Sequence, residues 1–228
     1  MTTHPTPDGT PDAPRLAVRG EAHLEVDPET ARLEITVLAR GTDRRTALDD
    51  LTTRNTHTTQ LIKSYPDALH KLETSTLSIT PELHRGRGER IRAYHGRVHL
   101  TAHLTDFTAL GELTTRLADQ DLTRITGPYW ELTPDSPAHS EARRLAVHEA
   151  VQRAREYAAA LDTRLHALLE LADIGAETTT AYPQMAPTSR AAFAGAPTDT
   201  PPALDLEPQR QTVHAAVNAR FTMIAPTL

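Results

Sequence analysis

The sequence predicts an α+β fold in which long antiparallel β-hairpins pack with one long and two shorter helices. Two patterns succeed one another along the chain. In some stretches every second residue is apolar, which is typical of strands with one wet face, and in others apolar residues recur every three or four positions, as in helices. Hairpin-like pairs of strands thus mix with helices, which favours an α+β protein over a doubly wound parallel sheet.

Two strands are expected at the start of the ordered chain, near Arg15. Apolar residues alternate with polar ones through Leu16–Val26 and again through Ala31–Ala39. The wet face of the first strand carries Arg19, Glu21, His23 and Glu25. Between the strands, residues 27–29 (Asp-Pro-Glu) form a turn signal. We therefore expect the two strands to pair with each other as a hairpin.

A helix and a second hairpin should follow. The helix is expected to begin after Thr42 or Asp43, because either side chain can accept a hydrogen bond from a free amide of the first turn, and to stop before Pro66. The arms of the hairpin are predicted at Leu69–His84 and Arg90–Leu104, with a Gly-Arg-Gly tip at residues 86–88.

The second half of the chain should contain two more helices and three strands. A short helix at Phe107–Asp119 leads to a strand at Leu122–Leu132. The longest helix is expected after Ser136, with Pro137 at its first position, where no amide partner is lost. Its predicted stripe consists mostly of small residues: Ala142, Ala146, Val147, Ala150, Val151, Ala154, Tyr157, Ala158 and Leu161.

The last two strands have different patterns. Leu165–Ile174 is an apolar run bounded by Gly175, which is typical of a buried strand. Gln211–Ile224 alternates apolar and polar residues and should close a sheet.

The chain is expected to form one main domain. Residues 1–14 are rich in Pro and Thr and should be a disordered arm. Residues 15–225 should form the α+β domain, with a division into sub-lobes 15–133 and 134–225. Residues 176–208, rich in Ala, Pro and Thr, are expected to be a mobile loop.

Composition excludes several classes of function. The 228 residues carry a net charge of −6 with both signs interspersed, which argues against a nucleic-acid binder. The absence of cysteine rules out disulfides and thiolate sites. No apolar run is long enough to span a membrane, and the amino terminus lacks the pattern of a secretory signal, so a cytoplasmic location is expected.

Histidines and arginines around the second hairpin are the candidate interaction residues. His95, His99 and His103 recur every four positions. On a strand such a step covers about 13 Å, too far for neighbouring members to bind one zinc ion without outside ligands. They are interpreted as a polar row on a solvent or subunit face, or alternatively as a face that gains charge below neutral pH and loosens an interface.

Four arginines flank the tip of that hairpin: Arg85, Arg87, Arg90 and Arg92. One interpretation is a charged tip that discourages pairing between sheet edges. The other is a contact for an anion or an acidic partner. No nucleophile elbow or phosphate-binding loop is present in the sequence, so no catalytic residue, metal ligand or cofactor is predicted.

A resemblance to a known family rests on diffuse motifs rather than reactive groups. Its opening is Gly20-Glu21, then residues 28–31 (Pro-Glu-Thr-Ala) before the alternating strand 33–37. Its most specific stretch is Glu141-Ala142-Arg143 followed by the regularly spaced Ala146, Ala150, Ala154 and Ala158. Over residues 15–225 the chain resembles the SIMPL-domain family, bacterial proteins often described as oxidative-stress-defence or periplasmic immunogenic proteins. Glu29 stands where that family usually has aspartate.

The resemblance implies an α+β fold and ring-like or hollow homo-oligomers, with no established catalytic residues. The expected function is therefore a non-enzymatic, stress-related scaffold or partner-binding protein whose first partner is a second copy of itself. One alternative is a small-molecule or metal-binding protein with a pocket between the hairpins and the long helix. Another is an adaptor that docks through residues 176–208.

Overall fold

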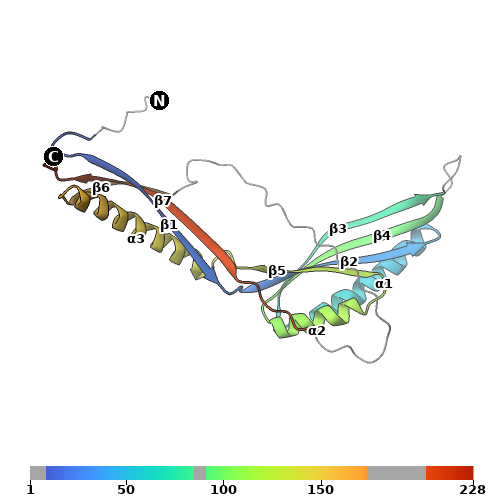
Figure 1. Cartoon of the computed structure of the whole chain (residues 1–228). Helices are drawn as coiled ribbons and strands as arrows, with labels where there is room; N and C mark the ends of the chain where they lie inside the picture. Colours follow the sequence, from blue (N-terminus) through green and yellow to red (C-terminus); the bar gives the residue numbers. More distant parts are fainter. Residues whose placement is uncertain (1–8, 85–90, 174–203, 228) are drawn as a thin grey trace. The chain divides into compact units, whose positions relative to one another are not determined.

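The computed structural model describes residues 9–84, 91–173 and 204–227 (Figure 1). Within them the chain forms three helices and seven strands in two antiparallel sheets. This architecture confirms the predicted α+β class.

The chain divides into two compact units, each with its own core. The described residues of unit 1 are 9–26, 134–173 and 212–227, and those of unit 2 are 27–84, 91–133 and 204–211. This division differs from the expected sub-lobes 15–133 and 134–225 at two places. Residues 204–211 belong to unit 2. The first strand belongs to unit 1, because its sheet partner comes from the end of the chain.

Unit 2 is a four-stranded sheet with two helices on one face (Figure 1). The strand order is β3-β4-β2-β5. Its elements are β2 (Thr30–Gly41), α1 (Arg44–Lys63), β3 (Leu69–Leu83), β4 (Ile91–Leu104), α2 (Phe107–Ala118) and β5 (Thr123–Glu131). The alternating apolar residues of β2 and β4 share a buried cluster with leucines and isoleucine from both helices.

Local signals place the helices of unit 2 where the sequence predicts them. The Asp43 carboxylate accepts a hydrogen bond from the amide of Thr46 at 2.9 Å and caps α1. Asp106 caps α2 by accepting from the amide of Thr108 at 2.8 Å. Such caps satisfy amides that have no partner within the helix.

Strands β3 and β4 pair antiparallel, which confirms the second predicted hairpin. The register runs from Leu69 opposite Leu104 to Leu83 opposite Ile91. The predicted Gly-Arg-Gly tip lies outside the described residues.

Unit 1 is a three-stranded sheet backed by the long helix (Figure 1). The strand order is β1-β7-β6. Its elements are β1 (Arg15–Val26), α3 (Pro137–Ala160), β6 (Leu165–Asp173) and β7 (Gln211–Met223). Ser136 caps α3 and Pro137 opens it, as predicted.

Helix α3 lies very close to β1 because its buried stripe consists of alanines. Five of them are buried at four-residue steps: Ala142, Ala146, Ala150, Ala154 and Ala158. Opposite them sits Gly20, where a Cβ would lie 2.1 Å from the carbonyl oxygen of Ala146. Tyr157 and Leu161, expected on this stripe, are instead exposed, whereas Val147 and Val151 are partly buried against the same core.

The predicted hairpin between the first two strands is wrong. β2 pairs with β4 and β5 in unit 2, whereas β1 lies beside β7 in unit 1. Residues 27–29 carry the chain from one unit to the other and do not reverse it within a sheet. The alternation of apolar residues defines the two faces of a strand but does not specify its neighbour.

The prediction of a buried strand at Leu165–Ile174 is also wrong in its burial. β6 is at the edge of its sheet, and most of its residues are exposed. An apolar run is typical of a strand covered on both faces. In β6 both faces of the strand carry exposed residues.

Two further predicted segments are described only in part. Of the expected arm 1–14, residues 10–13 form a turn, and the carbonyl of Pro14 accepts a hydrogen bond from the amide of Met223 at 3.0 Å. Of the expected loop 176–208, residues 176–203 lie outside the described residues. Leu206 packs against the core of unit 2.

Candidate functional site

The exposed face of the sheet in unit 2 carries the residues that the sequence singled out. In β4 the even-numbered residues from Val98 to Leu104 enter the core shared with α1 and α2. His95, His99 and His103 therefore lie on the opposite face, since neighbouring residues of a strand point to opposite sides.

Each of these histidines has a different polar neighbour. His95 Nε2 lies 2.7 Å from Glu82 Oε2, and His99 Nδ1 lies 2.9 Å from Thr36 Oγ1. His103 Nδ1 is 3.6 Å from Glu131 Oε2. The three side chains thus belong to three separate local contacts spread along β4.

Glu82 is the centre of an ion-pair group at one end of this face. Its carboxylate lies 3.1 Å from Arg40 and 3.2 Å from Arg92, in addition to His95. The hydrogen bond with His95 and the charges of the two arginines lower the pKa of Glu82. Arg92 is therefore already paired within the chain, whereas Arg85, Arg87 and Arg90 lie outside the described residues.

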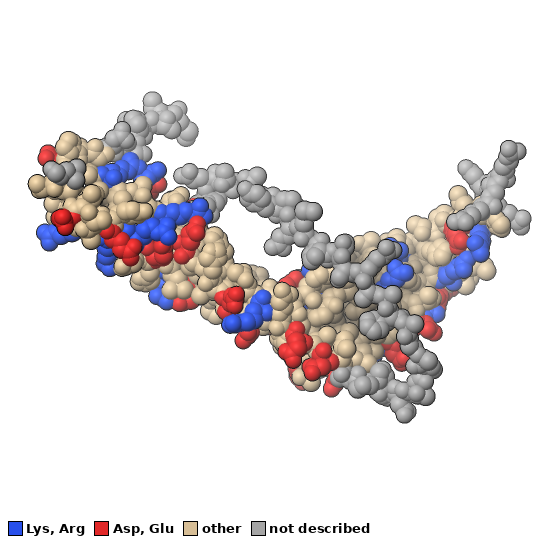
Figure 2. Space-filling view, viewed as in Figure 1, with Lys and Arg blue, Asp and Glu red and all other residues tan. Residues whose placement is uncertain are grey.

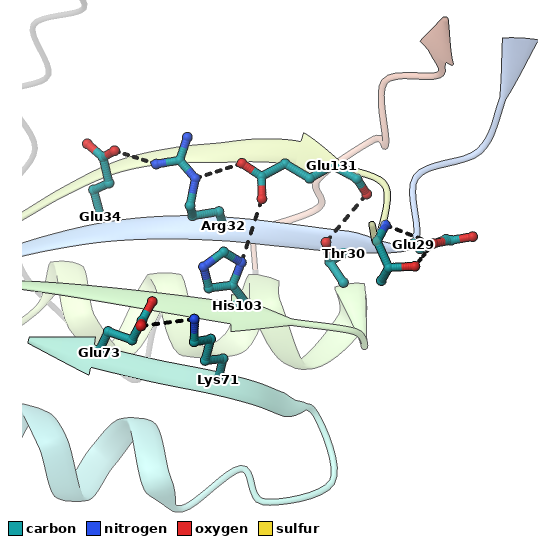
Figure 3. A network of polar contacts seen from close by, with 9 residues as sticks. Glu29, Thr30, Arg32, Glu34, Lys71, Glu73, His103 and Glu131 are labelled. Carbon is teal, nitrogen blue, oxygen red and sulfur yellow. Dashed lines mark hydrogen bonds and ion pairs between the residues drawn. The ribbon is translucent and has the colours of Figure 1, made fainter. Parts of the chain in front are cut away.

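A second network surrounds Arg32 at the other end of the face (Figure 3). Arg32 Nε lies 2.7 Å from Glu131 and its Nη1 lies 2.5 Å from Glu34. Its guanidinium also covers the ring of Tyr129 at 4.4 Å. Partial burial lowers the pKa of Arg32, but the hydrogen bonds to the two carboxylates outweigh it and the pKa is raised.

Glu131 connects this network to its neighbours, as Figure 3 shows. One carboxylate oxygen accepts from Arg32 and the other faces His103, while its main-chain carbonyl accepts from Thr30 at 3.4 Å. The adjacent Glu29 accepts hydrogen bonds from the amide and hydroxyl of Thr133 at 2.9 and 2.5 Å. These contacts join β2, β4 and β5 and suit a structural role.

Sequence reasoning missed this network for a definable reason. The alternation in β2 places Arg32 and Glu34 on the wet face. Glu131 joins them only because β5 pairs with β2 in a register that shifts between Arg32 and Glu34. Strand pairing at that range is not encoded in local periodicity.

A basic depression of about 460 Å³ lies on the same face. Its polar lining comes from neighbouring strands: Arg40, Ser78, Thr80, His95, Arg97 and Arg124. Guanidinium and hydroxyl donors of this kind suit a small anion. On the face of each unit that Figure 2 shows, basic and acidic side chains lie interspersed.

Acid is expected to destabilise unit 2 through His103. Desolvation lowers the pKa of His103, and Arg32 and Lys71 act in the same direction against the opposing charges of Glu131 and Glu73. The unfolded imidazole, with a pKa of about 6.5, therefore takes up its proton first as the pH falls. The stability contributed by the neutral side chain is complete above that pH and is lost as the pH drops toward the folded pKa.

Urea unfolding followed between pH 7.5 and 5.5 measures this effect. His103→Gln should flatten the loss of stability on acidification. His70→Gln, at an exposed position of β3, is the matched control and should keep the wild-type slope. Equal slopes for His103→Gln and the wild type would contradict the expectation.

Within the described residues, two antiparallel sheets that are each backed by helices define an α+β protein. The chain belongs to the SIMPL family: the family model described as "Protein of unknown function (DUF541)" matches residues 16–221. No curated protein matches the chain. Among the described residues, no helix has the length and apolar character needed to cross a membrane.

Proposed function

We propose that this SIMPL protein is a non-enzymatic homo-oligomer that serves as a scaffold or partner-binding protein, and that its copies join through the edge strand β6. The observation that carries the proposal is the exposure of Leu168, Leu169 and Leu171 at 54, 53 and 47%. The proposal includes the stress-related role and the cytoplasmic location expected from the sequence.

Strand β6 has the features of an unfinished sheet. Within the part of the chain that the structure describes, β7 is its hydrogen-bonding neighbour, and no strand pairs with its other edge. Protected edges usually carry lysine, proline or inward-pointing charge. The sequence of β6, LHALLELAD, has neither Lys nor Pro, and its Glu170 is paired with Arg220.

A groove with both apolar and polar lining continues this surface toward α3. It has a volume of about 430 Å³ and lies between the C-terminal part of α3 and β6. The apolar part of its lining is Val151, Ala158, Leu165, Ala167, Leu168 and Phe221, and the polar part is Arg155, Thr163, Arg164 and His166. A strand added beside β6 would cover the exposed leucines and pair the free backbone groups at once.

A second copy is the partner that best fits this edge. Every copy presents the same strand, so the complementary surface is always available at the protein's own concentration. The sheet of unit 1 has two edges, β1 and β6. Contact of β6 with another β6 closes a dimer, whereas contact of β6 with β1 generates a ring or a fibre.

Light scattering coupled to gel filtration tests the proposal. The wild-type chain at about 10 µM should have a mass of two or more times the 25.0 kDa of one copy. The double variant Leu169→Lys/Leu171→Lys should dissociate at least tenfold more easily, since each lysine places a charge in the contact. Leu48→Lys, at a 40% exposed leucine of α1, is the control and should remain assembled.

Two outcomes would reject the proposal. A wild-type monomer at this concentration would exclude self-assembly, and an oligomer that the double variant leaves intact would exclude β6 as the contact. Circular dichroism checks that the variants are folded. Electron microscopy then separates a ring from a two-fold dimer.

The alternative function, small-molecule binding, has one supporting feature in the basic depression of unit 2. Its lining comes from β2, β3, β4 and residues 122–124, and not from the long helix that the sequence-based hypothesis placed beside the pocket.

A further inference from the structure

Glu21, His23 and His214 bring three metal-ligating groups to one place on the sheet of unit 1. Glu21 and His23 are two residues apart in β1, so they share a face of the strand. His214 comes from β7, the neighbour of β1. One ligating atom from each residue lies within 4.8 Å of the other two.

This face is the one that points away from the long helix. Val18 and Ala22, which alternate with Glu21 and His23, belong to the buried cluster with α3. His23 and His214 are exposed, and Glu21 is partly buried. A metal ion could therefore reach the three groups directly from solvent.

The two imidazoles already lie against each other. Their ring centroids are 4.5 Å apart, with an angle of 45° between the planes. Two ligands at about 2.1 Å from a tetrahedral ion are about 3.4 Å apart. Small rotations of exposed side chains would bring the ligand atoms from their present separation to that distance.

Two contacts of Glu21 affect its use as a metal ligand. Arg19 Nε lies 2.6 Å from Glu21 Oε1, which occupies one of its two oxygens. The main-chain amide of Glu21 donates to Glu149 Oε2 at 3.2 Å and ties this part of β1 to α3. The cation of Arg19 therefore reduces the affinity for a metal ion without filling the site.

We propose that Glu21, His23 and His214 form a binding site for a divalent transition-metal ion, with Zn²⁺ as the best-suited ion. Imidazole nitrogens suit Zn²⁺, Cu²⁺ and Ni²⁺, whereas Mg²⁺ and Ca²⁺ prefer oxygen ligands throughout. Three protein ligands leave a fourth position open to water or to a partner's side chain. The ion joins β1 to β7 and so stabilises the folded state of unit 1.

Calorimetric titration of the full chain with Zn²⁺ alone, without a histidine tag, tests the site. The wild type should bind one equivalent at this site. His23→Gln and His214→Gln should each weaken Zn²⁺ binding at least tenfold. Loss of a residue that only hydrogen-bonds to a metal ligand already costs about tenfold or more, and a direct ligand should cost at least as much. His166→Gln, an exposed histidine of β6 in the same unit, should leave the affinity unchanged.

Arg19→Gln tests the same site through an expected gain in Zn²⁺ affinity. It frees the carboxylate of Glu21 and should strengthen Zn²⁺ binding several-fold, while Glu21→Gln should weaken it. Equal binding by the wild type and the double variant His23→Gln/His214→Gln would overturn the site. Binding weakened by Arg19→Gln would remove Glu21 as a ligand.

Discussion

Gly20→Val is expected to lower the free energy of unfolding of unit 1 by about 3 kcal/mol, the upper part of the usual cost of overpacking a core. A Cβ at Gly20 would lie 2.1 Å from the carbonyl oxygen of Ala146 and 2.5 Å from the amide nitrogen of Ala150. Both are backbone atoms of α3, so no side-chain rotation relieves the contact. The helix must move away from β1 and uncover its alanine row.

The strand propensity of valine works in the opposite direction but is smaller. The whole β-propensity scale spans about 1 kcal/mol. Ala17→Val, on the exposed face of the same strand, is the matched control and should be neutral or slightly stabilising. Shrinking Ala150 to glycine should not rescue Gly20→Val, because the carbonyl of Ala146 still blocks the new side chain.

Two spectroscopic signals separate the units in this experiment. The single tryptophan, Trp130, packs against the core of unit 2, so its fluorescence follows that unit. Far-UV circular dichroism follows helices in both units. Gly20→Val should move a dichroism transition to lower urea and leave the fluorescence transition in place; an unchanged dichroism midpoint would contradict the close packing of α3 on β1.

Local chemistry was sufficient to predict most of the individual elements. Asp43 and Ser136 cap their helices as the sequence indicates, and β3 pairs with β4 across a short connection. The buried alanine row of α3 also follows from spacing alone. In each case the interacting groups are close in sequence or repeat with a fixed period.

Partners far apart in the sequence could not be predicted in this way. Glu21 and His23 were placed on the wet face of the first strand, but His214 joins them only because β7 lies beside β1. Because the first two strands were expected to pair with each other, β7 was not expected beside β1. The network of Arg32 and Glu131 was missed for the same reason.

Leucines of β6 illustrate a different limit. Their apolar character predicted burial, and within one copy of the chain they remain about half exposed. Hydrophobicity indicates that a surface is suited to burial but does not identify what covers it. Assembly of copies along β6 would reconcile the sequence pattern with the exposure, and the lysine variants test that explanation.

Leu33→Ala is expected to destabilise unit 2 by about 2–5 kcal/mol, the range for truncating a fully buried leucine. Leu33 of β2 is 0% exposed and belongs to the cluster formed with α1 and α2. A Cβ built on Gly127, which has a φ of 122°, would lie 3.3 Å from Leu33 Cδ2. The site is thus packed from the β5 side as well.

Fluorescence of Trp130 should report this loss directly, because Trp130 packs against the same cluster and lies edge-on to Phe107 at 4.8 Å. Leu48→Ala removes the same atoms from a 40% exposed position of α1 and should cost less than about 1 kcal/mol. Similar losses for the two variants would mean that the cluster around Leu33 is not the core of unit 2. Since Trp130 fluorescence follows unit 2 alone, a shift of the fluorescence transition by Gly20→Val would show that the two cores unfold together.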